Sequence, residues 1–481
     1  MPERTPTADR TPTAARAPTS AAGPTPAAGP ISAADRTPLT WRAASLAILA
    51  GGFALGLGAA GGGRARGLVG VAALLAGGYV VPLAAAGRHP PIPPGVPPLD
   101  PETRPPTFTV LVAARDEANV LPALVGDVAA QAHRAPDGTP WFELLVVDDR
   151  STDGSADSVL AAAEAAGIGA VTRIVRREGD GLPDGKGAAL SAAQPDACRG
   201  DVVVVLDADA RIGPAFLGRL AAYLRAGAGA VTARRRMLDA GSGWLAGAQA
   251  DEQTLDGEIQ RGRWSLGGCS EFRGNGIVVR RDLLASVGGW RPEALTEDLD
   301  LSSRLAAAHG ITVAWAIDAE VWEEPVRSLD GLWRQRLRWA EGGLRRVLEH
   351  GPAVVTSPAL GGYARLDFAA YAGQLAIPPV ILGTLAGAVV RGQWAPAAII
   401  AGTYLAAGGS LAWDALRWET GPEGQALEPA ERLRRSVRVG LFSAVWLAAI
   451  PAALIRLATR RGRVGYAKMA HVGGGRGEWV G

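Results

Sequence analysis

The sequence predicts an α/β domain with a mostly parallel sheet, flanked on both sides by transmembrane helices. In the middle of the chain, β-rich runs alternate with helical segments, and these runs are Thr109–Ala113, Leu144–Val147 and Asp201–Leu206. Continuous runs of Val and Leu with helices between them are typical of a parallel sheet covered on both faces. Long stretches without a charged residue lie before and after this part of the chain. Ligands of such a sheet bind beyond the carboxyl ends of its strands.

Composition excludes several classes of protein. The 481 residues carry 49 Lys and Arg against 47 Asp and Glu, a net charge of +2, which does not indicate a nucleic-acid partner. The two cysteines, Cys198 and Cys269, form no CxxC pattern, and the five histidines are dispersed. The sequence therefore predicts neither a disulfide scaffold nor a zinc site.

The first part of the chain contains a tail and two predicted membrane spans. Residues 1–40 are rich in Pro, Thr and Ala without bulky apolar residues, and such a segment is expected to be disordered. Within residues 41–88, the uncharged stretches Ala43–Gly63 and Gly67–Gly87 are each long enough for a transmembrane helix. A buried helical pair of a soluble domain is the alternative, but soluble helices seldom stay uncharged for so long. Residues 89–107 read as a stiff Pro-rich linker.

The last part of the chain repeats the membrane pattern. Within residues 366–456, three uncharged stretches are candidate transmembrane helices: Phe368–Val390, Ala395–Trp413 and Val439–Ile455. Pro378 and Pro379 are expected to break or kink the first of them. Residues 457–481 form a basic, Gly-rich tail.

Arginines in the loops predict the orientation in the membrane. Five of them lie between the last two candidate spans, which places that loop on the cytoplasmic side: Arg417, Arg432, Arg434, Arg435 and Arg438. Counting spans backwards then makes the central domain and the N-terminal tail cytoplasmic. The basic C-terminal tail would fall outside, against the positive-inside tendency, unless Val439–Ile455 is re-entrant. The sequence leaves both possibilities open.

Two acidic motifs follow predicted strands. Asp207 and Asp209 are two residues apart at the end of an apolar strand, so their carboxylates can hold a hard divalent cation that neutralises a diphosphate; a solvated turn is the alternative. Asp148 and Asp149 end the preceding strand, where they can accept hydrogen bonds from a base and a ribose. The segment that follows, in which Ser151 or Asp153 can cap a helix from Ser155, offers a purely local explanation.

Two further motifs sit at predicted helix starts. Thr296-Glu297-Asp298-Leu299-Asp300 precedes an apolar-periodic helix, so its acids are either ordinary partners of the helix dipole or include a general base in a cleft. Lys186, in Asp184-Gly185-Lys186-Gly187, can reach a phosphate, although the surrounding pattern is not a Walker A loop.

Residues 331–352 predict a basic amphipathic helix just before the C-terminal membrane block. Such a helix is expected to lie on the anionic cytoplasmic leaflet. Its Gln335, Arg338 and Trp339 can in addition serve a sugar site, because Trp stacks on a pyranose and Arg binds phosphate with two donors.

The order of these motifs is more specific than any one of them. The series Arg115-Asp116-Glu117, Asp148-Asp149, Lys186, Asp207-Ala208-Asp209, Thr296-Glu297-Asp298 and Gln335-Arg336-Leu337-Arg338-Trp339 resembles the membrane-bound branch of glycosyltransferase family 2. Cellulose, chitin, hyaluronan and poly-N-acetylglucosamine synthases are in that branch, as are glucosyltransferases acting on ceramide or diacylglycerol. The resemblance covers roughly Thr109 to His350 and implies a Rossmann-like GT-A domain at residues 108–330.

The resemblance also implies roles for individual residues. Asp298 would be the general base with Glu297 beside it, Glu117 would lie near the nucleoside, and either Asp148 or Asp149 would contact uracil. Lys186, Asp207 and Arg338 would bind the nucleotide sugar, while Asp209 with Asp207 would hold Mg²⁺ or Mn²⁺. Gln335 and Trp339 would hold the diphosphate and the acceptor-side sugar.

Parts of the chain differ from or extend this pattern. Asp116 stands where the family usually has Asn, and Ala113-Ala114 where Pro is usual, which concerns the nucleotide site. The segment from Phe272 to Gly276 resembles the family's acceptor-side loop.

The function expected from this resemblance is an inverting, metal-dependent hexosyltransferase in the cytoplasmic membrane. It would move a sugar from a nucleotide donor such as UDP-glucose to a lipid or lipid-linked acceptor at the cytoplasmic face. A processive polysaccharide synthase of the same family is the first alternative. A sugar nucleotidyltransferase would explain neither Gln335–Trp339 nor the membrane blocks, and a non-enzymatic transporter would need polar residues in its spans, where Gln374 is nearly the only one. Donor sugar, acceptor and oligomeric state are not determined by the sequence.

Overall fold

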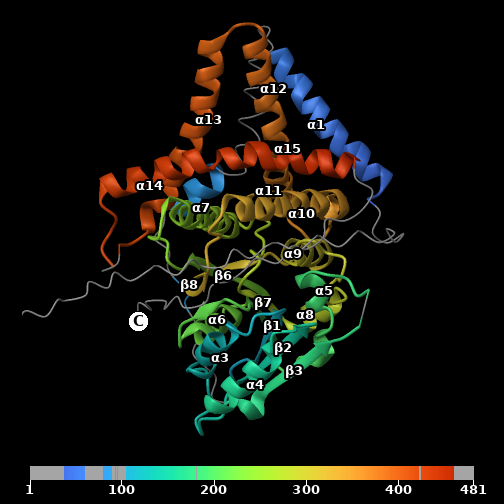
Figure 1. The fold of residues 1–481 in the computed structure, drawn as a ribbon, viewed down its shortest axis with the longest axis vertical. Helices are drawn as coiled ribbons and strands as arrows, with labels where there is room; N and C mark the ends of the chain where they lie inside the picture. Colours follow the sequence, from blue (N-terminus) through green and yellow to red (C-terminus); the bar gives the residue numbers. More distant parts are fainter. Residues whose placement is uncertain are drawn as a thin grey trace, which may run out of the picture.

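The computed structural model of the protein describes residues 37–59, 80–88, 93, 95, 104–179, 181–421 and 424–459. It contains an α/β domain built around one eight-stranded sheet and a group of helices that covers one end of this domain (Figure 1). The strands are β1 (Phe108–Ala114), β2 (Phe142–Asp149), β3 (Thr172–Arg177), β4 (Val202–Asp207), β5 (Arg211–Ile212), β6 (Ala230–Met237), β7 (Ile277–Arg280) and β8 (Ala314–Glu323). The predicted tail 1–40, the linker 89–107 and the tail 457–481 lie largely outside the described residues.

Helices pack on both faces of the sheet and at its carboxyl edge. Those of the α/β domain are α3 (Leu121–Ala129), α4 (Ser155–Ala165), α5 (Lys186–Leu190), α6 (Phe216–Arg225), α7 (Trp244–Ser265), α8 (Arg281–Ser286) and α9 (Glu297–His309). The remaining helices are α1 (Leu39–Ala59), α10 (Leu329–Thr356), α11 (Gly362–Gly373), α12 (Ile377–Val390), α13 (Trp394–Ala415), α14 (Pro429–Phe442) and α15 (Ala444–Thr459).

The sheet has the strand order β3-β2-β1-β4-β7-β6-β8-β5, and parallel pairing joins the first four strands. Val110 of β1 lies beside Leu144 of β2 and Val204 of β4, so the three predicted strands are neighbours. Strand β7 is antiparallel to β4 and β6, β6 is parallel to β8, and β5 is antiparallel to β8. The predicted mostly parallel sheet of an α/β domain is therefore confirmed.

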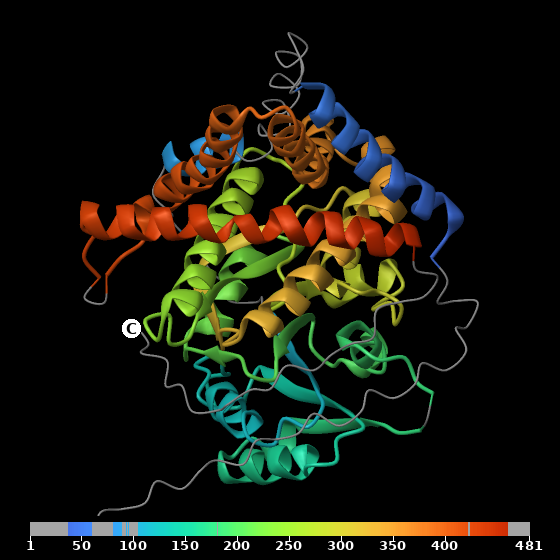
Figure 2. The ribbon, with the colours of Figure 1, turned by 45° about the horizontal axis from the view of Figure 1, so that its top comes forward.

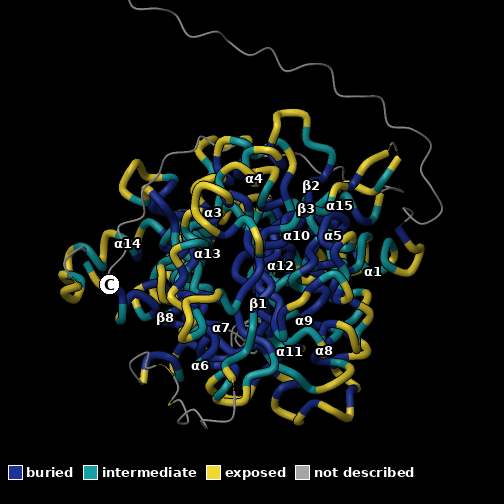
Figure 3. Tube along the Cα trace, turned by 90° about the horizontal axis from the view of Figure 1, so that it is seen from below, coloured by how far each residue is buried: buried dark blue, intermediate teal, exposed yellow. Residues whose placement is uncertain are grey.

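Alternation along the strands creates one apolar core on each face. Val110 and Val204 pack with α3, α4 and α6, while Leu111 and Val203 pack with α5, α8 and α9. Strand β1 lies in the buried interior with exposed loops around it (Figure 3). Because the central strands are apolar on both faces, their polar residues gather at the carboxyl ends, where a ligand can approach.

Helix α10 lies between the α/β domain and the outer helices. Its Leu337 and Leu344 pack against α15, and Gly342 faces Thr296 so closely that a Cβ would stand 2.2 Å from the Thr296 methyl carbon. Two of its arginines are buried and bind carboxylates of the α/β domain: Arg336 contacts Glu252, and Arg346 contacts Glu271. The expectation that the basic residues of this helix face a lipid leaflet is therefore wrong for these two, because a guanidinium shielded from water requires an internal counter-charge.

Helices α1, α12 and α13 project together away from the sheet (Figures 1 and 2). Small residues let α1 and α12 approach, since a Cβ on Gly56 would lie 2.2 Å from the Val380 carbonyl oxygen. By length and composition, four helical stretches of the described chain are candidate membrane spans, at 39–59, 362–390, 394–418 and 429–459. The predicted second span falls mostly outside the described residues; its last part, in the helical segment 80–88, docks on α7 through Leu83 and Ile259.

Two expected spans of the C-terminal block are arranged differently from the prediction. The stretch expected to span at Phe368–Val390 is interrupted at Gln374–Ala376, just before the two prolines, and only α12 projects outward, while Phe368 of α11 packs with Cys269 of the α/β domain. The break itself was expected, because a proline cannot donate the helical hydrogen bond.

Helices α14 and α15 run across the base of the projecting helices (Figures 1 and 2). Arg438 binds Asp251 of α7, and Arg456 contacts Glu341 of α10 at 3.4 Å, so both ends of this stretch are tied to the same layer. Arg438 and Arg456 are about 27 Å apart along a helix at about 1.5 Å per residue, nearly the thickness of a hydrocarbon core. The stretch expected to cross at Val439–Ile455 thus lies across the projecting helices in this structure, although 429–459 is long and apolar enough to cross a membrane.

Candidate active site

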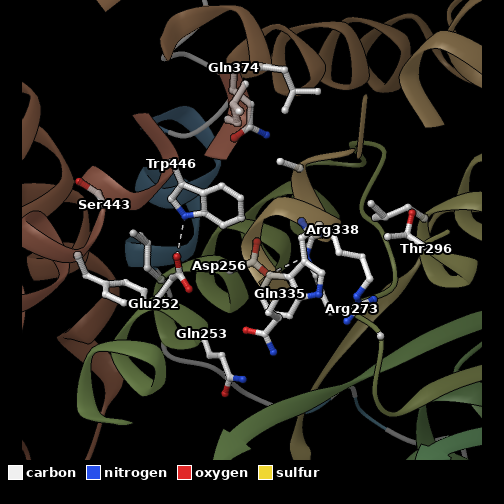
Figure 4. Close-up of a pocket in the computed structure, with 18 of the residues that line it drawn as sticks. Glu252, Gln253, Asp256, Arg273, Thr296, Gln335, Arg338, Gln374, Ser443 and Trp446 are labelled. Atoms are coloured by element: carbon white, nitrogen blue, oxygen red, sulfur yellow. Dashed lines mark hydrogen bonds and ion pairs between the residues drawn. The ribbon is translucent and has the colours of Figure 1, made fainter. Parts of the chain in front are cut away.

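A cavity of about 1140 Å³ lies between the carboxyl edge of the sheet and the outer helices. One part is polar and is lined by strand ends, by α7 and by the starts of α5 and α9; the other part is apolar and is lined by α12, α13 and α15 (Figure 4). The structure brings nearly all residues that the sequence singled out to this cavity: Glu117, Asp149, Lys186, Asp207, Asp209, Glu297, Asp298, Gln335, Arg338 and Trp339. Asp148 is the one that does not line it.

The conformation of the loop after β1 explains why Asp116 can stand where the family usually has Asn. Asp116 has a φ of 52°, a left-handed conformation that Asn and Asp tolerate better than other non-glycine residues. Its carboxylate accepts a hydrogen bond from the Thr152 N–H at 2.7 Å, while its own N–H donates to Ser151 Oγ at 2.9 Å. An acceptor at this position is sufficient for the local structure, and an aspartate supplies one as an asparagine does.

The two aspartates at the end of β2 make different contacts. Asp148 Oδ1 accepts the Ser151 N–H at 3.1 Å and shapes the turn, whereas Asp149 faces the cavity and pairs with Arg177 at 2.7 Å. The alternation of side chains along a strand decides between them, since successive residues point to opposite faces. The helix-capping alternative also holds in part: Asp153 accepts the N–H of Ser155, the first residue of α4, at 3.0 Å.

Lys186 joins the two acidic groups across the cavity. Its Nζ lies 2.5 Å from Asp207 Oδ1 and 3.5 Å from Glu297 Oε1, and it donates to the Gly274 carbonyl at 2.8 Å. Burial alone would lower the pKa of Lys186, but the charges of Asp207 and Glu297 raise it above its ordinary value. A fixed ammonium therefore stands among the carboxylates, where an incoming diphosphate would need positive charge.

The acidic pair after β4 is held by neighbouring backbone and amide groups. Asn275 Oδ1 accepts the Asp207 N–H at 3.1 Å, and Asp209 Oδ2 accepts the Glu324 N–H at 3.1 Å. Asp207 keeps 36% of its side chain exposed, so its carboxylate faces the cavity and not the core. An all-oxygen set of this kind suits Mg²⁺ or Mn²⁺.

Glu297 and Asp298 form a second acidic pair at the start of α9. Burial raises the pKa of both carboxyls, and the charge of Asp298 raises the pKa of Glu297 further. Lys186 lowers both pKa values, and Arg273 lowers that of Asp298, without offsetting burial. A carboxylate with a raised pKa is a stronger base, so the pair is suited to accept a proton. The third acid of the motif, Asp300, binds Arg291, Arg304 and His350 outside the cavity.

Gln335, Arg338 and Trp339 reach the same cavity from α10. Two guanidinium groups lie near the Trp339 ring, those of Arg336 at 4.3 Å and Arg235 at 5.7 Å from its centre. Arg336 also donates to Gln335 Oε1 at 2.7 Å. Cation–π contact and hydrogen bonding thus fix Trp339 and Gln335 before any ligand enters.

Several residues of the cavity were not found from the sequence. Helix α7 supplies Glu252, Gln253 and Asp256, β6 supplies Arg235, and α15 supplies Trp446 (Figure 4). Helix α7 gave no signal because it has no apolar stripe; its buried side chains include charged ones such as Asp251 and Arg263, which are satisfied by distant partners. Arg273 and Asn275 belong to the acceptor-side loop that the sequence pointed out, although without assigned roles.

Paired carboxylates at the strand ends, a second acidic pair facing them and a Gln-Arg-Trp group from a following helix define a glycosyltransferase of the GT-A fold. Residues 105–342 match the model of the family described as Glycosyltransferase like family 2. The chain is 31% identical over 373 residues to the beta-monoglucosyldiacylglycerol synthase of Synechocystis sp., covering 76% of this chain and 75% of that protein. The chain belongs to glycosyltransferase family 2.

A second relative agrees with this assignment, and a solved structure agrees with the fold. The poly-beta-1,6-N-acetyl-D-glucosamine synthase of Staphylococcus aureus is 26% identical over 240 residues, 49% of this chain and 54% of that protein. The mannosyltransferase PcManGT from Pyrobaculum calidifontis, solved with GDP-Man and Mn²⁺, superposes with a TM-score of 0.53 at 21% identity, over 80% of this chain and 97% of that chain. The expected GT-A fold and glycosyltransferase class are confirmed, over a nucleotidyltransferase or a transporter.

Proposed function

We propose that this enzyme transfers a single glucose from UDP-glucose to the hydroxyl of a diacylglycerol at the membrane surface. The observation that carries the proposal is the continuity of the cavity, which runs from Asp298 to apolar side chains of α12 and α13 such as Ile381 and Ile399. A lipid acceptor needs such a passage, because its hydroxyl must reach the polar end while its chains stay in an apolar one. The name of the Synechocystis relative supports the same sugar and acceptor.

In this proposal the residues at the polar end of the cavity have separate roles in the reaction. Asp149 and Glu117 hold the nucleoside, and Lys186 and Arg338 bind the diphosphate, whose negative charge grows as the bond to the sugar breaks. Asp298, with Glu297 beside it, removes the proton of the acceptor hydroxyl as its oxygen attacks the anomeric carbon. Gln335 and Trp339 orient the sugar and the acceptor. Attack from the side opposite the diphosphate gives inversion, which requires the base to come from another segment than Asp207 and Asp209.

Asp207 and Asp209 fit a divalent cation in this proposal. They are two carboxylates from one strand end that line the same cavity, and the side chain of Asp207 is partly exposed. Mg²⁺ or Mn²⁺ held there would neutralise charge on the departing diphosphate. Lys186 already lies 2.5 Å from Asp207 Oδ1, so one cationic group stands beside this pair.

Radiolabelled UDP-glucose supplied to membranes that contain the enzyme, with Mg²⁺ or Mn²⁺, tests the proposed function. We expect label in the organic phase as monoglucosyldiacylglycerol, increased by added diacylglycerol and lost on chelation of the metal. Parallel reactions with UDP-galactose and UDP-N-acetylglucosamine test the donor. Label in size-excluded polymer would instead establish a processive synthase, and no label dependent on Asp298 in any fraction would overturn the proposal.

We further propose that the catalytic domain and both ends of the described chain face the cytoplasm. Arg42, near the start of α1, donates to the Ala458 carbonyl at 3.0 Å, so the first and last described helices have neighbouring ends. With α15 lying along the surface, the basic residues after Thr459 no longer conflict with the positive-inside tendency.

Reporter fusions measure this sidedness directly. A fluorescent protein that matures only in the cytoplasm, fused after Gly481, is expected to be bright, and alkaline phosphatase at the same position is expected to be inactive. A fusion within the α12–α13 turn, at Gly392, provides the control with the opposite result. An active phosphatase at the C-terminus would mean that the chain crosses after α13, contrary to the proposal.

A further inference from the structure

Three polar side chains from different elements line the cavity in the zone where its lining changes from polar to apolar. These are Glu252 of α7, Trp446 of α15 and Gln374 between α11 and α12 (Figure 4). Above this zone the lining is mostly apolar and comes mainly from α12 and α13, with Ile377, Val380, Ile381, Ile399, Ile400 and Leu411. Its polar members include Thr384, Thr403 and Tyr404 of the same helices. Below this zone lie Gln335, Arg338 and the carboxylates. An amphipathic ligand would place its own polar-to-apolar junction in this zone.

We propose that Glu252 and Gln374 bind the glycerol and ester region of the lipid acceptor, with Trp446 holding Glu252 in position and the acyl chains lying between α12 and α13. This inference rests on the proposed function and names the part of the site that selects the acceptor. We call the three residues Glu252, Gln374 and Trp446 the collar.

Glu252 is held by donors from two sides. The Trp446 indole N–H donates to its Oε1 at 2.7 Å, and Arg336 lies 2.5 Å from its Oε2. These contacts come from α15 and α10, so the carboxylate is fixed between the α/β domain and the outer helices. A carboxylate can accept about four hydrogen bonds. Two acceptor positions therefore remain for a hydroxyl of the ligand, at a side chain that is 17% exposed to the cavity.

Trp446 contributes shape as well as its N–H. Its ring lines the cavity, and the Arg336 guanidinium lies 5.6 Å from the ring centre. The same guanidinium stacks on Trp339 at 4.3 Å, so one arginine connects the collar with the Gln335–Trp339 group. Movement of Trp446 would therefore be felt both at Glu252 and at the proposed sugar site.

Gln374 is a polar side chain in an apolar stretch. It begins the short helical turn Gln374–Ala376 that separates α11 from α12, and its amide points into the cavity on the side of Trp446 and Gln335 (Figure 4). Among the described residues, its amide has no hydrogen-bond partner. A polar side chain within a candidate membrane span, here 362–390, is costly unless it has a hydrogen-bond partner. An ester carbonyl or a glycerol hydroxyl would satisfy the amide.

Steady-state kinetics of the full-length enzyme in nanodiscs test the collar. The wild type is first assayed for transfer to 1,2-dioleoylglycerol; absence of transfer would overturn the proposed function and, with it, this inference. With transfer established, KM is measured for diacylglycerol and for UDP-glucose in Gln374→Leu, Glu252→Gln and Trp446→Phe. We expect each variant to raise the KM for diacylglycerol about tenfold, the loss of roughly one hydrogen bond. The KM for UDP-glucose should change less than twofold in Gln374→Leu. It should also rise in Glu252→Gln and Trp446→Phe, because Glu252 and Trp446 both contact Arg336, which stacks on Trp339.

A matched control is available at the far end of the cavity. Gln393 is an exposed amide at the α12–α13 turn, and Gln393→Leu is expected to leave both KM values as in the wild type. The collar would be refuted if Gln374→Leu and Glu252→Gln left the KM for diacylglycerol unchanged, or if Gln374→Leu raised both KM values equally.

Photo-crosslinking gives a readout that does not depend on turnover. A diacylglycerol with a diazirine in its acyl chain should label peptides of α12 and α13, and unlabelled diacylglycerol should compete with this labelling. Labelling that resists competition, or that is confined to other helices, would contradict the placement of the acyl chains.

Discussion

Asp298→Asn is expected to reduce glucose transfer about 10³-fold while UDP-glucose still binds. An amide has nearly the shape of the carboxylate but cannot accept the proton of the acceptor hydroxyl. The residues that line the donor end, Asp149, Lys186 and Asp207, are untouched by the change. Transfer rates together with calorimetric binding of UDP-glucose check both parts of the expectation. Normal turnover by this variant would remove Asp298 from its proposed role.

The same variant should be more stable than the wild type at neutral pH. Folding raises the pKa of Asp298 through burial, so the folded chain binds its proton more tightly than the unfolded chain, and stability falls as the pH rises toward the folded pKa. Removing the ionisable group removes this loss. Asp300→Asn is the matched control, two residues further along α9 and outside the cavity. It breaks ion pairs with Arg291 and Arg304, so it should lower the melting temperature while keeping most of the activity.

Glu271→Gln is expected to destabilise the protein by about 3–5 kcal/mol, because it leaves buried arginines without their counter-charge. Glu271 is 1% exposed and lies 2.7 Å from Arg346, 3.3 Å from Arg273 and 3.7 Å from Arg263. This cluster joins α7, α10 and the acceptor-side loop, so its loss should also disturb Arg273 beside Asp298. Thermal unfolding in detergent measures the change.

The pH dependence of stability provides a second test of Glu271. Burial raises its pKa, but Arg346, Arg263 and Arg273 more than offset this and lower it to about 2. The stabilisation is therefore present above the unfolded-state pKa and is lost as the pH falls toward 2. Glu271→Gln should reduce this loss of stability in acid.

Asp330→Asn is the control at an exposed ion pair. It removes a surface pair with Arg334, and the side chains of Asp330 and Arg334 are 72% and 59% exposed. This variant should change stability by less than about 1 kcal/mol. Equal effects of the two variants would contradict the importance of the buried cluster.

Local chemistry was sufficient to predict the parts of the site that lie at strand ends and helix starts. An apolar run followed by Asp207-Ala208-Asp209 defines both a central strand and its polar end. In a parallel sheet such ends meet at one edge, so Asp149 and Asp207 come together without any information about loops. Glu297 and Asp298 could be located at the start of α9 for the same reason, because acids favour a first helical turn.

Contacts between distant segments could not be predicted in the same way. The sequence left Asp148 and Asp149 equivalent, and only the pleat of β2 within the sheet turns Asp149 to the cavity. Glu252 and Trp446 are hydrogen-bonded across 194 residues, and neither has a local pattern that marks it. Arg336 and Arg346 of α10 could not be distinguished from lipid-facing charges in the sequence, because their partners Glu252 and Glu271 lie far away along the chain.

The sequence by itself determined the α/β class, the acidic motifs and the presence of membrane-type helices, because these depend on the period and polarity of neighbouring residues. Tertiary structure alone decided that α14 and α15 lie across the other helices. Hydropathy counts only the apolar length of Val439–Ile455, whereas its orientation is set by ion pairs of Arg438 and Arg456 with Asp251 and Glu341. Those pairs join residues that are far apart in the sequence, so they form only when the α/β domain and α10 have folded.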